Sequence, residues 1–95
     1  MKKFFIVELT IKQGERAQLL KYLNNYAMEV RKEVGCECLD VLVYLESENS
    51  EVLYEIWRDV AAQLAHLETK GFANWKAFSD PLIEGFSVKT LKSGE

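Results

Sequence analysis

The segment from Glu51 to Trp75 limits the possible folds more than any other part of this 95-residue chain. Its first half, EVLYEIW, is typical of a β-strand, in which side chains alternate between two faces. Leu53, Glu55 and Trp57 share one face, and the opposite face is also apolar. A strand in water ordinarily keeps one polar face, so both faces of this strand require cover. Glu55 is either a carboxylate at a solvated rim or a group with a function, because glutamate is rarely buried without a partner.

The second half of this segment predicts a helix that Asp59 caps by accepting hydrogen bonds from its free amides. The main apolar stripe of that helix comprises Val60, Leu64 and Leu67. Residues 69–71, Thr-Lys-Gly, break or kink the helix. Helical spacing then resumes with Phe72, Trp75, Phe78 and Leu82. Pro81 ends the regular helix near Ser79 or permits only an irregular extension.

The remaining residues predict one more helix and three further strands. We expect the four strands at residues 3–10, 36–46, 51–58 and 86–92, with a polar turn at 47–50. From Glu15, apolar residues at steps of three and four predict an amphipathic helix of about 19 residues that Gly35 ends. The order β-α-β-β-α-β predicts an α+β, ferredoxin-like fold with an antiparallel sheet. We expect one domain over residues 1–95, with an ordered core of about 3–92.

The predicted sheet requires a partner. The two helices can cover only one of its faces, yet strands 36–46 and 51–58 are apolar on both faces. An uncovered apolar face of that size marks an interaction surface. A second copy of the chain, packed sheet against sheet, is the simplest cover, so we expect a homodimer.

Composition and charge exclude several functions. A net charge of −3 without a basic cluster gives no reason to expect nucleic acid or an anionic membrane as a partner. Glu8 interrupts the apolar run after MKKFF, so we expect neither a signal peptide nor a membrane span and place the chain in the cytoplasm. Cys36 and Cys38 should project from one face as packed, reduced thiols. A structural metal site would need more ligands than they provide.

A pocket is expected where the helices cover the face that carries Glu55. Its predicted lining is Leu53, Trp57, Phe72, Trp75 and Phe78. Such a mostly apolar cavity suits a planar aromatic ligand, although aromatics at helical spacing also form ordinary core. His66, the only histidine, could act with Glu55 as a general base on a phenol. The helical wheel, however, places His66 at the edge of the apolar stripe or in water.

The run YEIWRDVAAQLAHLET, with EVGCECLDVLV before it and FANW after it, resembles the antibiotic biosynthesis monooxygenase family. The resemblance extends from Phe4 to about Val88 and implies a dimeric α+β barrel. It also implies a cofactor-independent monooxygenase whose substrate anion, from a quinol or polycyclic phenol, reacts with molecular oxygen to give a quinone. Glu55, Trp57 and His66 match the E-x-W and A-H-L positions of the quinol-oxidising branch and are the expected catalytic residues.

The chain departs from the resembled family at several positions. Gly71 stands where the quinol-oxidising branch has a second histidine. Leu53 and Gln63 replace an Asn and a Tyr of the polyketide-modifying branch. Lys76 lies near the histidine ligand of the haem-degrading branch, and the first strand has no Asn, so haem is not expected. Two alternatives therefore stay open: a dimeric module that binds a small hydrophobic molecule without turnover, and an isomerase or lyase acting on a small carbonyl compound.

Overall fold

The secondary structure follows the predicted β-α-β-β-α-β order, with the second helical region divided in two. The computed structural model describes residues 1–95. Its elements are β1 (Lys3–Ile11), α1 (Arg16–Val30), β2 (Cys36–Leu42), β3 (Ser50–Trp57), α2 (Val60–Leu67), α3 (Lys70–Ser79), the short 3-10 helix η1 (Asp80–Leu82) and β4 (Ile83–Leu91). The α+β, ferredoxin-like fold is thereby confirmed.

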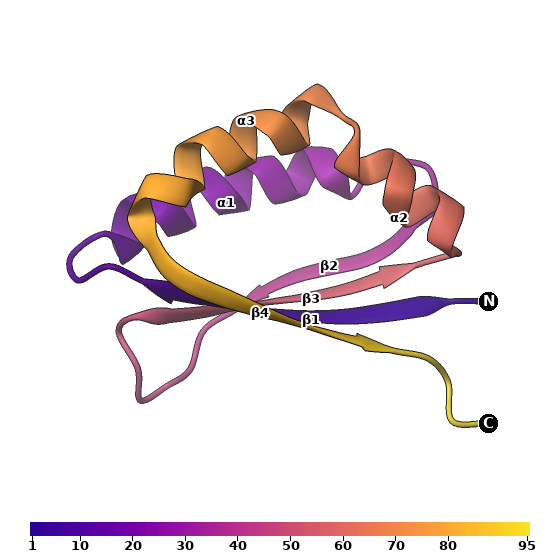
Figure 1. Cartoon of the computed structure of the whole chain (residues 1–95), viewed down its shortest axis with the longest axis horizontal. Coiled ribbons are helices and arrows are strands. Elements are labelled where there is room, and N and C mark those ends of the chain that lie inside the picture. Colours follow the sequence, from indigo (N-terminus) through magenta and orange to yellow (C-terminus); the bar gives the residue numbers. More distant parts are fainter.

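The four strands form one antiparallel sheet in the order β2-β3-β1-β4. All three α-helices lie over one face of this sheet (Figure 1). The register places Phe5 of β1 opposite Glu55 of β3, and Glu55 opposite Leu39 of β2. Because side chains alternate, the residues at these positions and at every second position along their strands face the helices.

Two apolar clusters pack between the helices and the sheet. One surrounds the fully buried indole of Trp57 and includes Ala27 of α1 and Ala62 of α2. The other includes Leu23 of α1 and Trp75 of α3. The core is therefore built from the predicted faces of β3 and α1, and it brings α1 and α3 together over the middle of the sheet.

The predicted cap at Asp59 is confirmed, and the structure adds a second cap at Thr69. Asp59 accepts a hydrogen bond from the backbone amide of Ala62 at 2.9 Å and begins α2. Thr69 accepts one from the amide of Phe72 at 3.1 Å and begins α3. The predicted break at residues 69–71 and the end of regular helix at Ser79 are thus confirmed.

Several predicted boundaries were wrong. The first helix ends at Val30 instead of continuing to Gly35, and Gly35 forms a left-handed turn (φ 85°) immediately before β2. Its carbonyl accepts the amide of Arg58 at 2.8 Å, which fixes this turn beside the end of β3. β2 stops at Leu42, four residues early, and β4 begins three residues early, at Ile83.

The predicted apolar stripe of the helix at 60–67 was also wrong. Val60 and Leu64 are 51% and 53% exposed, whereas Ala62 and His66 are the buried residues of α2. The small side chain of Ala62 lets the helix approach Gly35, and His66 four residues later lies on the same side. The prediction that His66 lies at an edge or in water was therefore wrong. The contacts of its imidazole with Glu33 and Trp57 outweigh the apolarity of the face that carries Val60 and Leu64.

A β-bulge separates the two cysteines, which were expected on one face. Cys36 pairs with Trp57 and packs against the core, while Cys38 pairs with Ile56, whose side chain points away from the helices. The extra residue in β2 changes the alternation between them. Both thiols are free, and burial raises the pKa of each.

The face of the sheet opposite the helices carries no helix (Figure 1). Its central side chains are apolar and partly exposed, and they comprise Phe4, Ile6, Val52, Tyr54 and Ile56. We refer to these five residues as the open sheet face. No helix of the structure has the length and apolarity required to cross a membrane.

Replacing Gly35 by alanine should destabilise the fold far more than the same change at Gly14. Both glycines have positive φ, 85° and 83°, so each substitution costs about 1 kcal/mol of conformational strain. A Cβ on Gly35 would also overlap the Cβ of Ala62, whereas nothing lies near Gly14. Urea unfolding should therefore show a loss of about 3 kcal/mol or more for Gly35→Ala. Equal losses for the two variants would contradict the close approach of α2 to this turn.

Candidate active site

A cavity of about 270 Å³ lies between the helices and the sheet. Fourteen of its 19 lining residues are hydrophobic, so it suits an apolar or aromatic ligand. Phe86 and Val88 of β4 line it although each is at least half exposed, because the helices leave this edge of the sheet uncovered. The cavity therefore opens toward solvent along β4.

The predicted pocket residues divide into two groups. Those that line the cavity are Leu53, Glu55, His66, Phe72 and Trp75. Trp57 and Phe78 do not. Trp57 is fully buried behind the cavity wall, and Phe78 stacks on Tyr22 with ring centroids 4.2 Å apart.

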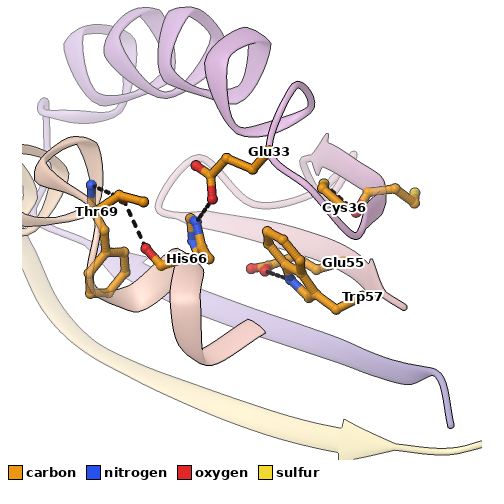
Figure 2. Close-up of polar contacts among 8 residues, drawn as sticks. Glu33, Cys36, Glu55, Trp57, His66 and Thr69 are labelled. Carbon is orange, nitrogen blue, oxygen red and sulfur yellow. Dashed lines mark hydrogen bonds and ion pairs between the residues drawn. The ribbon is translucent and has the colours of Figure 1, made fainter. Parts of the chain in front are cut away.

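His66 is positioned by a hydrogen bond and by contacts with neighbouring aromatic rings. Its Nδ1 lies 2.9 Å from a carboxylate oxygen of Glu33, which comes from the segment between α1 and β2 (Figure 2). The His66 ring stacks on the Trp57 ring with centroids 4.9 Å apart. It also makes an edge-to-face contact with the Phe72 ring, with centroids 5.4 Å apart. A carboxylate can only accept, so Nδ1 carries the hydrogen and Nε2 is left as the basic atom of the ring.

Glu55 accepts a hydrogen bond from the indole N–H of Trp57 at 2.9 Å (Figure 2). Burial raises the pKa of the Glu55 carboxyl, and the negative charge of Glu33 adds to that effect. The indole hydrogen bond and the nearby His66 act in the opposite direction. Glu55 thus lies at a cavity wall where protonation is easier than in water.

Sequence reasoning missed Glu33 and Tyr26. Glu33 was assigned to a continuous helix, and its role emerges only because α1 ends at Val30. The apolar spacing of α1 allowed either Tyr26 or Ala27 on its buried face. Tyr26 packs against the core and also lines the cavity, and its hydroxyl is buried without a hydrogen-bond partner. Two signals were available in the sequence. Glu33 lies only two residues before Gly35, and Tyr26 places a hydroxyl among the apolar positions of α1.

Lys76 lines the cavity, and two contacts hold its ammonium group in place. Its ammonium group pairs with Asp80 at 3.0 Å and lies 5.4 Å from the centre of the Phe86 ring. These contacts hold the lysine beside the exposed β4 edge of the cavity. The structure contains no cluster of three or more histidine, cysteine or acidic side chains that could hold a metal ion.

Glu51 is a second buried carboxylate, outside the cavity. It lies opposite Leu9 on the helix-facing side of β3 and has no exposed surface. Neither of its carboxylate oxygens has a hydrogen-bond partner. Burial raises the pKa of Glu51 to about 7, although the positive charge of Arg16 opposes the shift.

The model of the antibiotic biosynthesis monooxygenase family matches residues 4–77. Similar solved structures include a protein from Pseudomonas aeruginosa, with 22% identity, a TM-score of 0.93 and coverage of 99% of this chain and 95% of that one. A candidate antibiotic biosynthesis monooxygenase from Nitrosomonas europaea is 18% identical, with a TM-score of 0.92 and coverages of 98% and 99%. A Mycobacterium tuberculosis protein is 21% identical, with a TM-score of 0.92 and coverages of 100% and 97%. No curated protein matches the chain.

The buried Glu51 predicts a loss of stability as the pH rises. Its pKa of about 7 when folded exceeds the ordinary value of 4.5, so the folded state binds the proton more tightly than the unfolded state. Stability should therefore fall between about pH 5 and pH 8, by up to roughly 3 kcal/mol. Glu51→Gln, which stays neutral, should abolish that part of the decline in urea unfolding, whereas the exposed Glu46→Gln should not. Parallel pH profiles for the parent and Glu51→Gln would disprove the assignment.

Proposed function

Because the chain belongs to the antibiotic biosynthesis monooxygenase family, we propose that it is a cofactor-independent monooxygenase that oxidises a quinol or polycyclic phenol to a quinone. The observation that supports this most directly is the Glu33–His66 pair at the wall of a mainly apolar cavity. A positioned base and a water-poor aromatic site together are what deprotonation of a phenol requires.

In the proposed reaction the phenol hydroxyl donates its proton to Nε2 of His66. Glu33 stabilises the imidazolium that forms, because its carboxylate already accepts the hydrogen on Nδ1. The resulting phenolate is electron-rich and transfers electrons to molecular oxygen. For a polycyclic phenol with a hydrogen on the reacting carbon, the phenol and one oxygen molecule give the quinone and one water. One oxygen atom enters the ring, and the other leaves as water. A quinol already carries both ring oxygens, so with one oxygen molecule it gives the quinone and hydrogen peroxide.

The other candidate residues take different roles in this proposal. Leu53, Phe72 and Trp75 pack against the substrate, because they line the cavity. Trp57 acts as a positioning residue: it lies behind the wall, supports the face of the His66 ring and is itself fixed by Glu55. Phe78 supports the site indirectly by stacking on Tyr22.

We also propose that two copies associate through the open sheet face to form a dimeric α+β barrel. Partly exposed apolar side chains in the middle of a sheet mark a surface that binds a partner. The cavity lies on the helix side, so pairing through the open sheet face would leave it free to bind a ligand in each subunit.

The second candidate is a module of the same fold that binds a small hydrophobic molecule without turnover. The observation in its favour is the apolar cavity lining, with Leu53 contributing a hydrocarbon surface. Oxygen uptake separates the two proposals, because binding alone consumes none. Product formation without oxygen uptake would instead support the isomerase or lyase alternative.

Oxygen consumption by the metal-free protein, with a panel of quinols and polycyclic phenols, should depend on the base and its partner. His66→Ala should lower the rate by about 100-fold or more, the usual contribution of a general base. Glu33→Gln should lower it less, since the imidazole remains. Glu29→Gln, an exposed change on α1, is the matched control and should keep the parent rate. A His66→Ala variant that is folded and as fast as the parent would rule out the proposed base.

A charge placed on the open sheet face should prevent dimerisation. Ile6 lies at the middle of β1, opposite Tyr54, so Ile6→Lys would bury an unpaired ammonium group between the two sheets. Sedimentation velocity should show a dimer for the parent and a monomer for Ile6→Lys. Met28→Lys, on the exposed surface of α1, should remain dimeric. A monomeric parent, or a dimeric Ile6→Lys, would contradict the arrangement.

A further inference from the structure

We propose that the hydroxyl of Tyr26 binds the same ligand oxygen that His66 deprotonates, so that the cavity selects aromatic molecules that carry a hydroxyl group over pure hydrocarbons. This inference rests on the proposed function and specifies its substrate class. Tyr26 belongs to α1, whereas His66 belongs to α2, so the two groups approach the ligand from separate elements.

Tyr26 carries a polar group that has no partner in the protein. Its hydroxyl is buried, lies in a residue that lines the cavity, and has no hydrogen bond within the protein. Buried polar groups in folded proteins nearly always have a partner, because an unpaired one forfeits its interaction with water. A ligand oxygen in the cavity would supply the acceptor that the chain itself does not.

The ring of Tyr26 lies beside the rings of His66 and Trp75. It lies nearly parallel to the His66 ring, with centroids 6.4 Å apart, and to the Trp75 ring at 6.0 Å. Tyr26 is thus at the same end of the cavity as the base. Burial and the negative charges of Glu33 and Glu55 raise the pKa of the Tyr26 hydroxyl, so it remains a neutral donor.

Gly71 leaves space for the ring of Tyr26. A Cβ on Gly71 would lie 3.2 Å from Cε1 of Tyr26, closer than an ordinary contact. The absence of a side chain at the start of α3 therefore lets the tyrosine ring occupy its place beside the cavity. Gly71 is in a helix with negative φ, so backbone conformation does not require glycine here.

The chemistry follows from the donors and acceptors at this end of the cavity. A phenol would donate its proton to Nε2 of His66 and accept a hydrogen bond from Tyr26 on the same oxygen. After the proton moves, the phenolate would accept from both Tyr26 and the imidazolium. A hydrocarbon of the same shape would leave the Tyr26 donor unpaired, and such sites reject analogues that lack the polar group.

The test compares 1-naphthol with naphthalene, which share a ring system and differ by one hydroxyl. Binding is measured without oxygen, by tryptophan fluorescence, so that no turnover is needed. The parent should prefer 1-naphthol. Tyr26→Phe should weaken 1-naphthol binding by about tenfold and leave naphthalene binding unchanged. Tyr22→Phe, on the same helix and outside the cavity lining, should behave as the parent.

Thermal unfolding distinguishes a ligand-binding hydroxyl from a structural one. The Tm of ligand-free Tyr26→Phe should be equal to or higher than that of the parent, because the change removes an unpaired buried group. A lowered Tm with weaker binding of both ligands, an unchanged preference in Tyr26→Phe, or a parent without preference would each overturn the inference. If the preference depends on Tyr26 but no phenol stimulates oxygen uptake, the role of Tyr26 stands and the oxygenase proposal fails.

Discussion

The indole of Trp57 connects the parts of the candidate active site. A buried indole N–H needs an acceptor, and Trp57 finds one in Glu55, two residues earlier on the same face of β3. With the ring fixed in this way, its flat face supports His66, which in turn bonds to Glu33. A continuous series of contacts thus joins β3, α2 and the segment after α1. The cavity wall is ordered by these contacts, since His66 both bonds to Glu33 and stacks on Trp57.

The architecture could be predicted from the sequence because it depends on local signals. Alternation in β3, the cap at Asp59, the break at residues 69–71 and the proline after Ser79 all act over a few residues. The position of His66 could not be predicted in this way. A helical wheel ranks faces by apolarity, but the buried face of α2 was selected by a carboxylate 33 residues away. Glu33 was missed for the related reason that the end of α1 depends on the turn at Gly35.

Gly71 differs from the resembled branch in sequence, and in the structure it leaves space for Tyr26. In the sequence it marks the loss of a histidine found in the resembled quinol-oxidising branch. In the structure the vacated space is next to Tyr26, whose ring would be crowded by any side chain at this position. A polar group is therefore still present at that end of the cavity, although it comes from α1 instead of α3.

Because α2 is short, we expect it to open locally more easily than the rest of the fold. An eight-residue helix is marginal without tertiary contacts, and α2 buries only Ala62 and His66. The interactions that orient the imidazole are therefore also a large part of what holds this helix in place. Amide hydrogens of α2 should exchange with solvent through local opening, at a lower free energy than those of the central strands β1 and β3. Such opening would give a ligand a second route to the cavity, and a ligand bound to His66 would slow it.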